Sequence, residues 1–325
     1  MKDYLINASV RLLCNYADLP FNTDKNEAAA RTVTERVSAA LERSGDNYAY
    51  LLPDGLHEGI KRDICDKRLI HPDTDAAKFS VLYLRMDGKA CIQTAVCDHA
   101  AVSVFSETGD LHECLGIARH IRHQLTASGT IARDADYGYL TTHPCDAGTG
   151  MRAALLLHLP MLQLTKQFDK MIRLMSASGA SLRPASNDLS NMTGSLYLLE
   201  NRAALGKSVT DMANLLLENA EKALDIEKKC RHAAIDTRDE GIYDAVWRAY
   251  GIARYARRLT GTDALGLWSH LTLGVSIGAF ELESNILDSL WEVAHDQVEA
   301  LKASTLTHPD IIRAQFVRSL FNGGN

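Results

Sequence analysis

The residues best suited to chemistry include a glycine-containing segment, residues 138–153, which reads GYLTTHPCDAGTGMRA. It contains a histidine, a cysteine and an arginine, namely His143, Cys145 and Arg152. Arginine binds phosphate through charge-assisted and often bidentate hydrogen bonds. The net charge of the chain is −6, so any phosphate would be bound by individual arginines rather than by a broad positive field. The same arginines are explained equally well by ion pairs with carboxylates of the chain itself.

The composition is that of a soluble globular protein with room for two domains. The chain has 325 residues, of which 46% are hydrophobic and 23% are charged. The net charge of −6 and a pI of about 6.1 argue against nucleic acid or anionic lipid as a partner. No apolar run is long enough to span a bilayer, so we expect no membrane association.

Seven cysteines are scattered along the chain without any C-x-x-C pair. Their number is odd, and residues 1–11 mix charged and apolar side chains, unlike a secretion signal. We therefore expect reduced thiols and a cytoplasmic location.

Two short patterns imitate binding sites. His120 and His123 share one face of a predicted helix, but no further ligand joins them there, so no metal site is expected. Gly206-Lys207-Ser208 resembles the end of a P-loop but lacks the upstream glycine, because Asn201 is at that position. It predicts a turn and a helix cap instead.

The pattern of apolar residues predicts an α+β fold, with an antiparallel sheet flanked by helices and an all-helical C-terminal part. The predicted strands cover residues 79–86, 91–96, 99–105, 139–142 and 152–159, with a tight turn at 87–88. The predicted helices cover residues 27–43, 111–126, 164–175, 208–232, 240–259, 263–280, 283–302 and 310–321. The change in character predicts two domains, 1–232 and 233–325.

Residues 138–153 closely resemble the signature of the ATP:guanido phosphotransferases, G-Y-L-T-S-C-P-T-N-x-G-T-G-L-R-A. In that family a strand ending in H-L-P follows, and H-L-P is found here at 158–160. Residues 7–15 resemble the family's S-S-R-I-R-L-A-R-N, and residues 183–208 follow its R-G-x-x-G-E … L-G-K-S segment without a gap. The resemblance covers essentially the whole chain and implies the phosphagen-kinase fold for the first domain.

The helical part is similar to bacterial protein-arginine kinases rather than to animal phosphagen kinases, as residues 248–251 and 273–278 indicate. In those kinases a motif R-D-x-x-R-A contributes to a pocket that recognises phosphoarginine. The motif reads P-D-I-I-R-A here, so the resemblance implies a phosphoarginine-pocket-like pair, Asp310 and Arg313, without the first arginine. The alternative is structural: Thr307 and Asp310 cap the last helix, and Asp310 pairs with Arg313.

The family transfers a phosphoryl group from ATP to a guanidinium, which depends on positioning and on neutralising charge. The resemblance implies five arginines around the phosphates, a glutamate base, an acceptor-side carboxylate and a nearby cysteine. Ser9 and Ala101 replace two of the five arginines. ATP with magnesium is therefore the implied cofactor, and we expect it to bind weakly. The implied cofactor-binding residues are Arg11, His99, Arg152 and Arg183.

The catalytic positions depart further from the family. Its N-E-E sequence is A-V-C here, so Cys97 replaces the base, and a thiol with a pKa of about 8.5 is mostly neutral at pH 7. The acceptor-side glutamate becomes Asp188 and the reactive cysteine becomes His143. Losing a general base lowers a rate by roughly 10²–10⁴, and losing one charge-stabilising group by roughly 10²–10³. We therefore expect a catalytically impaired homologue, a pseudokinase, that acts as a binding or regulatory subunit.

Two other functions stay open. The first is a working protein-arginine kinase that has rebuilt its site, with Asp98, Asp87 or His143 as the base. The second is a phosphoarginine-binding module. For a regulatory subunit, the resemblance implies an active arginine kinase or Clp-type protease machinery as the partner.

We predict that residues 233–325 mediate self-association into a two-fold symmetric homodimer. Large apolar residues occur there on more than one face of the predicted helices, and all three tryptophans of the chain are among them. The resembling kinases also dimerise through this part. The alternative is that these residues only fill the core of the small domain. Light scattering checks the prediction, and a strictly monomeric chain at tens of micromolar would contradict it.

Overall fold

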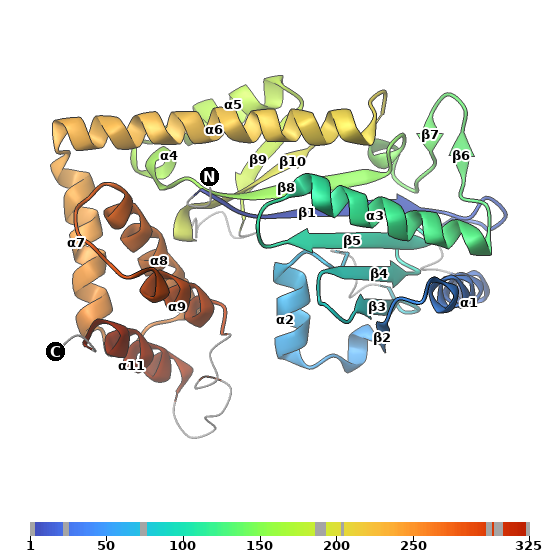
Figure 1. Ribbon diagram of the computed structural model, residues 1–325, viewed down its shortest axis with the longest axis horizontal. Helices are drawn as coiled ribbons and strands as arrows, with labels where there is room; N and C mark the ends of the chain where they lie inside the picture. Colours follow the sequence, from blue (N-terminus) through green and yellow to red (C-terminus); the bar gives the residue numbers. More distant parts are fainter. Residues whose placement is uncertain are drawn as a thin grey trace.

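The computed structural model describes residues 4–21, 26–71, 77–185, 193–202, 205–296, 301 and 308–322. One sheet of eight strands dominates the first part of the chain (Figure 1). Its strands are β1 (Leu5–Cys14), β2 (Tyr48–Leu51), β3 (Val81–Arg85), β4 (Ala90–Thr94), β5 (Ala100–Ser106), β8 (Met151–His158), β9 (Ala180–Pro184) and β10 (Leu196–Asn201). They lie in the order β2-β3-β4-β5-β1-β8-β10-β9, and all neighbours are antiparallel. The predicted α+β fold is confirmed.

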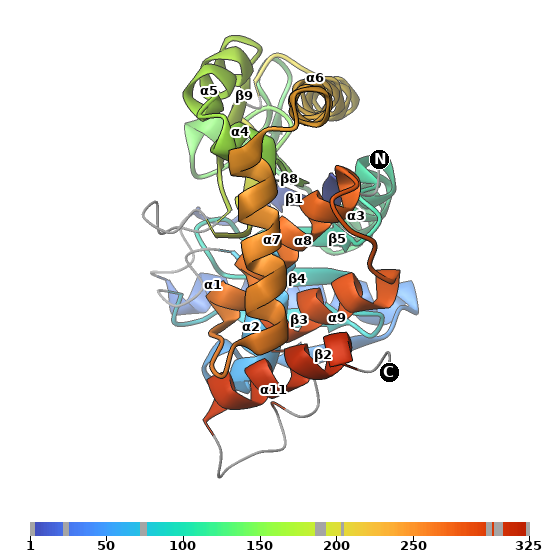
Figure 2. The ribbon, with the colours of Figure 1, turned by 90° about the vertical axis from the view of Figure 1, so that its left-hand side faces the viewer.

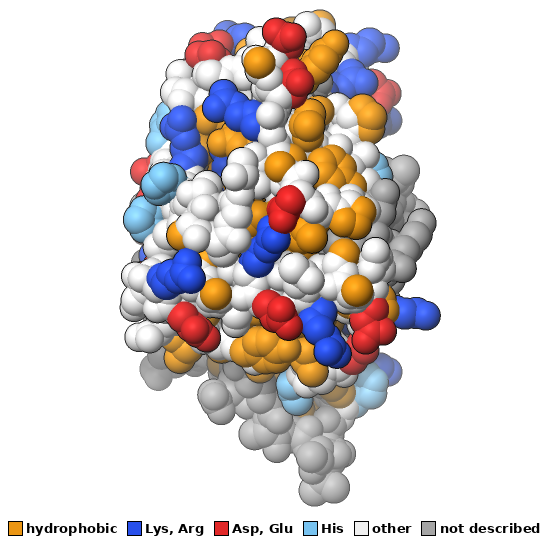
Figure 3. All heavy atoms as spheres, turned by 90° about the vertical axis from the view of Figure 1, so that its right-hand side faces the viewer, with side chains coloured by type: hydrophobic (Ala, Val, Ile, Leu, Met, Phe, Trp, Pro, Cys, Tyr) orange, Lys and Arg blue, Asp and Glu red, His pale blue; other side chains and the backbone are white. Residues whose placement is uncertain are grey.

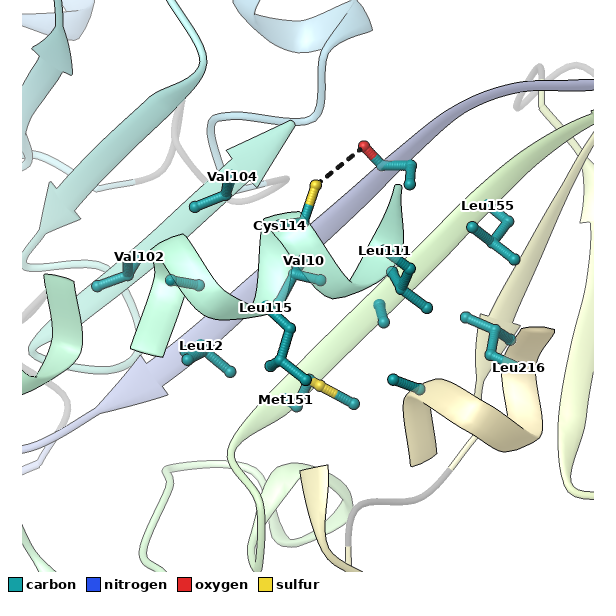
Figure 4. Packing of buried hydrophobic residues seen from close by; sticks show 14 of the residues in the cluster. Val10, Leu12, Val102, Val104, Leu111, Cys114, Leu115, Met151, Leu155 and Leu216 are labelled. Atoms are coloured by element: carbon teal, nitrogen blue, oxygen red, sulfur yellow. Dashed lines mark hydrogen bonds between the residues drawn. The ribbon is translucent and has the colours of Figure 1, made fainter. Parts of the chain in front are cut away.

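Four helices cover one face of this sheet. They are α1 (Glu27–Ser44), α3 (Leu111–Leu125), α5 (Phe168–Ala177) and α6 (Val209–Thr237). Side chains cap three of them: Asn26 caps α1, Asp110 caps α3, and Ser208, where a helix cap is predicted, forms a capping box with Asp211 at the start of α6. The helices and the sheet share one apolar core, in which Val10 and Leu12 of β1 lie close to Leu115 of α3 (Figure 4).

The strands have two faces of different character because side chains alternate along them. On β1, Ala8, Val10 and Leu12 belong to the core, whereas Asn7, Ser9 and Arg11 line a cavity on the opposite face. On β8 the odd-numbered residues 151–157 are core, and the even-numbered residues 152–156 line that cavity. The register of the sheet therefore decides which polar residues share one site.

A group of helices follows the sheet and lies beside it (Figures 1 and 2). It consists of α7 (Glu240–Tyr255), α8 (Gly261–Ser276), α9 (Ser284–Ala294) and α11 (Pro309–Asn322). Its apolar side chains pack against Leu156, Leu196 and Leu198 on the second face of the sheet. The predicted domain boundary near residue 232 lies inside α6, and the chain turns into α7 at Arg238, which has a left-handed φ of 49°.

Several predicted elements are longer than those observed. The helices predicted to residues 280 and 302 end at Ser276 and Ala294, because Gly278 (φ 70°) and Asp296 (φ 55°) take left-handed backbone angles. The strand predicted at 139–142 is reduced to a hairpin of β6 (Arg133–Asp134) with β7 (Gly138–Tyr139). Within the described ranges, no helix has both the length and the apolar character that a membrane crossing requires.

A buried ion pair joins α6 to its surroundings. The carboxylate of Glu227 accepts hydrogen bonds from the Met161 and Leu162 N–H groups at the start of α4 (Pro160–Leu164), at 3.0 and 3.2 Å. It also accepts one from Arg231 Nε at 3.1 Å, and Arg231 Nη1 donates to Ser276 Oγ of α8 at 2.9 Å. Both side chains of the pair are almost fully buried. The pair thus connects the sheet domain to the C-terminal helices.

We predict that Glu227→Ala lowers the free energy of unfolding by about 3–5 kcal/mol, because it leaves Arg231 as an uncompensated buried cation. Urea denaturation followed by circular dichroism measures the loss. Glu221→Ala is the matched control, since Glu221 is exposed on the same helix, and it should change stability by less than about 0.5 kcal/mol. Equal effects of the two substitutions would contradict the prediction.

Candidate functional site

A cavity of about 1830 Å³ lies between the second face of the sheet and the C-terminal helices. Residues of β1, β8, β9 and β10 line one side, α2 (Glu58–Asp66) and the turn after it line another, and α8 and α9 line the side opposite. The three predicted arginines, Arg11, Arg152 and Arg183, all line it. Arg68 joins them, so we call this space the arginine cavity.

Arg11 holds the turn after α2 against the sheet. Its Nε donates to Ser103 Oγ at 2.9 Å, and its Nη2 donates to the carbonyl oxygens of Arg68 and Ile70 at 3.0 and 2.5 Å. Burial lowers the pKa of Arg11 to about 10. The side chain therefore keeps its charge at neutral pH, while its Nη2 group bonds two backbone carbonyls.

Arg152 and Arg183 are each bound by a carboxylate of the chain. Arg152 donates to Asp146 through both Nε and Nη2, the latter at 3.1 Å, and this contact raises the pKa of Arg152. Arg183 donates to Glu200 through Nε at 2.7 Å and Nη2 at 3.2 Å. These are the bidentate contacts that a phosphate would make. A phosphate using the same donors must therefore displace Asp146 or Glu200.

Arg68 is a site residue that the sequence reasoning missed. Its Nε donates to Ser9 Oγ at 2.9 Å and its Nη2 to Asn7 Oδ1 at 2.5 Å. Burial lowers its pKa to about 10, and its backbone takes a left-handed φ of 54°. Ser9 is the position at which the resemblance implies an arginine, so a guanidinium reaches this place from another part of the chain. In the sequence, the replacement of that arginine by Ser9 is the one hint that another residue supplies a cation at this place.

The Asp98–His99 pair lies away from the arginine cavity and ties loops together. His99 is buried; its Nδ1 accepts from the Tyr16 N–H and its Nε2 contacts the Pro20 carbonyl, both at 2.8 Å. Burial lowers the pKa of His99, which favours the neutral ring that these contacts need. Asp98 accepts from Asn15 Nδ2 at 2.6 Å and from the Thr142 N–H at 2.8 Å. Because the Thr142 N–H donates to Asp98, it does not donate to a neighbouring strand, and β7 ends at Tyr139 rather than at the predicted residue 142.

The remaining predicted catalytic residues do not meet in the arginine cavity. Cys97 and His143 are absent from its lining, and His143 is exposed in the loop before β8. Cys145 of that loop is exposed, and its Sγ lies 3.2 Å from Arg152 Nη2. Asp188 lies outside the described residues.

The phosphoarginine-pocket-like pair is occupied by contacts within the chain. Arg313 is buried and donates to Asp310 Oδ1 at 3.1 Å and Asp296 Oδ1 at 2.5 Å, and also to the carbonyls of Leu259 and Val293. The ion pair that the structural alternative predicts is therefore present. Thr307, the predicted cap, lies outside the described residues.

The arginine cavity has charges of both signs. Across from the arginines, Asp288, Glu292 and Asp296 line the side formed by α9 and its end. Asp296 also forms an ion pair with Arg62 of α2, and both residues line the cavity. Such an arrangement can hold an anion on the sheet and a cation near α9. Among the described residues, no group of three His, Cys, Asp or Glu side chains could hold a metal ion.

Two family models match the chain. The model of the ATP:guanido phosphotransferase C-terminal catalytic domain matches residues 31–230. The model of the protein-arginine kinase McsB C-terminal domain matches residues 239–324. They confirm the resemblance deduced from the motifs, for both the sheet and the C-terminal helices.

Individual relatives agree with the family models. The protein-arginine kinase of Exiguobacterium sp. is 28% identical over 278 residues, covering 86% of this chain and 80% of the relative. That of Halothermothrix orenii is 26% identical over 327 residues, covering 99% and 94%. Among solved structures, lombricine kinase aligns with a TM-score of 0.60 at 18% identity, covering 70% of this chain and 67% of that chain. The duplicated taurocyamine kinase from Schistosoma mansoni also aligns with a TM-score of 0.60 at 18% sequence identity, covering 69% of this chain and 33% of that chain. At this identity the likeness shows the fold alone.

We predict that Glu200→Gln strengthens ATP binding by about tenfold. The substitution releases Arg183 from its internal carboxylate and removes a negative charge near Arg11 and Arg152. Calorimetry measures the affinity, with exposed Glu221→Gln as the control. The gain should disappear in the Glu200→Gln/Arg183→Ala variant, which lacks the released arginine; unchanged or weaker binding by Glu200→Gln itself would contradict the prediction.

Proposed function

Because this chain belongs to the ATP:guanido phosphotransferase family, we propose that it is a catalytically impaired relative of the protein-arginine kinases. It acts as a binding or regulatory subunit rather than as an efficient enzyme. One observation carries the proposal: Arg152 and Arg183 already serve Asp146 and Glu200, while the 95–97 segment offers no carboxylate as base.

The chemistry explains why this arrangement favours impairment. A guanidinium is protonated at neutral pH and must lose a proton before it attacks phosphorus, so the reaction needs a positioned base. Cys97 replaces the family's glutamate and does not line the arginine cavity. A missing base and the arginine missing at Ala101 lower the rate by several orders of magnitude, although such losses do not add simply within one site.

The residues of the arginine cavity are better suited to binding a polyphosphate than to transferring its phosphoryl group. Arg11, Arg68, Arg152 and Arg183 face one cavity, and ATP, when bound, supplies the phosphoryl group that the family transfers. Arg152 and Arg183 must give up Asp146 and Glu200 before they bind a phosphate. The lost ion pairs offset much of the free energy gained from the phosphate contacts. Weak nucleotide binding that depends on Arg11, Arg152 and Arg183 follows from this exchange.

The alternative of a rebuilt active site finds little support among the bases considered for it. Asp98 is buried and bound to Asn15 and Thr142. Asp87 accepts from Arg85 in the β3–β4 turn, and His143 is exposed. Asp288 and Glu292 are the carboxylates that line the arginine cavity from α9, so they are the bases to test should activity be found.

We predict no detectable arginine phosphorylation. The purified chain is incubated with ATP, magnesium and an arginine-rich protein, and acid-labile phosphoarginine is measured, with an active protein-arginine kinase as the positive control. Robust phosphoarginine formation that is abolished by Arg152→Ala would overturn the proposal. Sensitivity of that activity to Asp288→Asn or Glu292→Gln would then identify the base.

Self-association through the C-terminal helices is part of the same proposal. Trp247, Ile252 and Tyr255 of α7 are about half exposed or more, and such apolar residues are typical of interface cores. Removing the helices would uncover Leu156, Leu196 and Leu198 of the sheet, so Trp247→Glu is the cleaner variant for light scattering. An active arginine kinase or Clp-type protease machinery is the partner that a regulatory subunit of this kind would bind.

A further inference from the structure

A second cavity, of about 660 Å³, lies on the other face of the sheet, where α3 ends, the β6–β7 hairpin begins and α6 starts. We call it the α3–α6 cavity; it shares no lining residue with the arginine cavity. Four cations line it, Arg119, Arg122, Arg133 and Lys207, and no Asp or Glu is among its described lining residues. Figure 3 faces the end of the molecule that carries α1, β6 and β7, and Lys, Arg and His side chains gather at the upper left of this view.

Arg122 is the residue that points to a ligand. It is 6% exposed and belongs to the buried stripe of α3. Its guanidinium lies 3.9 Å above the Tyr139 ring, and its Nη1 donates to the Thr149 carbonyl at 3.1 Å. No described carboxylate lies within ion-pair distance of it. Buried charges in proteins are normally paired, so Arg122 is a buried cation without a counter-ion among the described residues.

The neighbours of Arg122 add positive charge rather than neutralise it. Arg133 lies 5.5 Å from the same Tyr139 ring, and Arg119 and Lys207 are exposed and make no ion pair with any described residue. Ser208 and Val209 bring the first turn of α6 to the cavity, and the dipole at a helix N-terminus favours an anion.

Asp211 and Asp134 belong to the elements that border the cavity, but their side chains bind backbone and hydroxyl groups of their own turns. Asp211 accepts from the Ser208 hydroxyl and N–H in the capping box of α6. Asp134 accepts from the N–H groups of Asp136 and Tyr137 in the hairpin turn. Neither lines the α3–α6 cavity. The described lining of this cavity therefore carries positive charge without a carboxylate to balance it.

We propose that the α3–α6 cavity binds a small molecule that carries two or more phosphate groups. Its volume is in the range of small-ligand sites, roughly 300–1,000 Å³. Four cations around one space suit several negative charges rather than one, and Arg122 offers donors for a phosphate oxygen from the floor. Lys207 follows a glycine turn and does not form a P-loop, but it places its charge at the same mouth.

Calorimetry with inorganic tripolyphosphate tests this second site. The arginine cavity is first weakened with Arg152→Ala/Arg183→Ala, and tripolyphosphate binding should persist in that background. Adding Arg119→Ala/Lys207→Ala should then weaken it at least tenfold, because two charge-assisted contacts are lost. The matched control is Arg257→Ala/Lys222→Ala, an exposed arginine and an exposed lysine outside both cavities, which should leave the affinity unchanged. Thermal unfolding confirms that each variant is folded.

Several results would overturn the proposal. Tripolyphosphate binding that is lost with Arg152→Ala/Arg183→Ala, or that is insensitive to Arg119→Ala/Lys207→Ala, would place the anion elsewhere. The absence of measurable binding at low salt would also refute it, since screening is then weakest. A phosphoserine peptide that binds more tightly than tripolyphosphate would replace the small molecule by a phosphorylated protein chain.

Discussion

Two arginines stand directly opposite one another in the middle of the sheet: Arg11 of β1 pairs in register with Arg152 of β8. Like charges at such positions destabilise an antiparallel pair unless something offsets them. Asp146 offsets one of them, and the oxygen atoms of Ser103, Arg68 and Ile70 offset the other. This constraint positions the turn after α2, because the carbonyl oxygens of Arg68 and Ile70 in that turn accept hydrogen bonds from Arg11.

The same constraint relates this chain to its family. The register that brings two arginines together is useful where a polyphosphate is bound, since the ligand then neutralises them. Here Asp146 neutralises Arg152, and uncharged oxygen atoms accept the hydrogen bonds of Arg11. Arg68 extends the pattern, because a cation returns next to Ser9 although the sequence lacks an arginine there. Arg68 thus keeps a cation beside Ser9, whereas residues 95–97 contain no carboxylate.

Local patterns in the sequence predicted much of this fold, and long-range contacts explain what they missed. Asn26 and Ser208 are caps whose helices begin where the sequence indicates. The central strand β1 is not among the predicted strands, although polar and apolar side chains alternate along residues 7–12. Arg68 could not be placed, since its partner Ser9 is 59 residues away in the chain. Arg122 was readable as a charge within the apolar stripe of α3, but nothing local shows that its counter-ion is missing.

The position of β1 in the sheet affects how the chain folds during its synthesis. β1 lies in the middle of the sheet, yet its partners β5 and β8 begin only at Ala100 and Met151. At roughly 5–20 residues per second, β1 waits on the order of ten seconds for β8 to be synthesised. An apolar strand that waits unpaired is prone to aggregate, and polar residues within it lower that tendency. We therefore expect that Asn7, Ser9 and Arg11, which line the arginine cavity of the finished fold, also keep the nascent chain soluble.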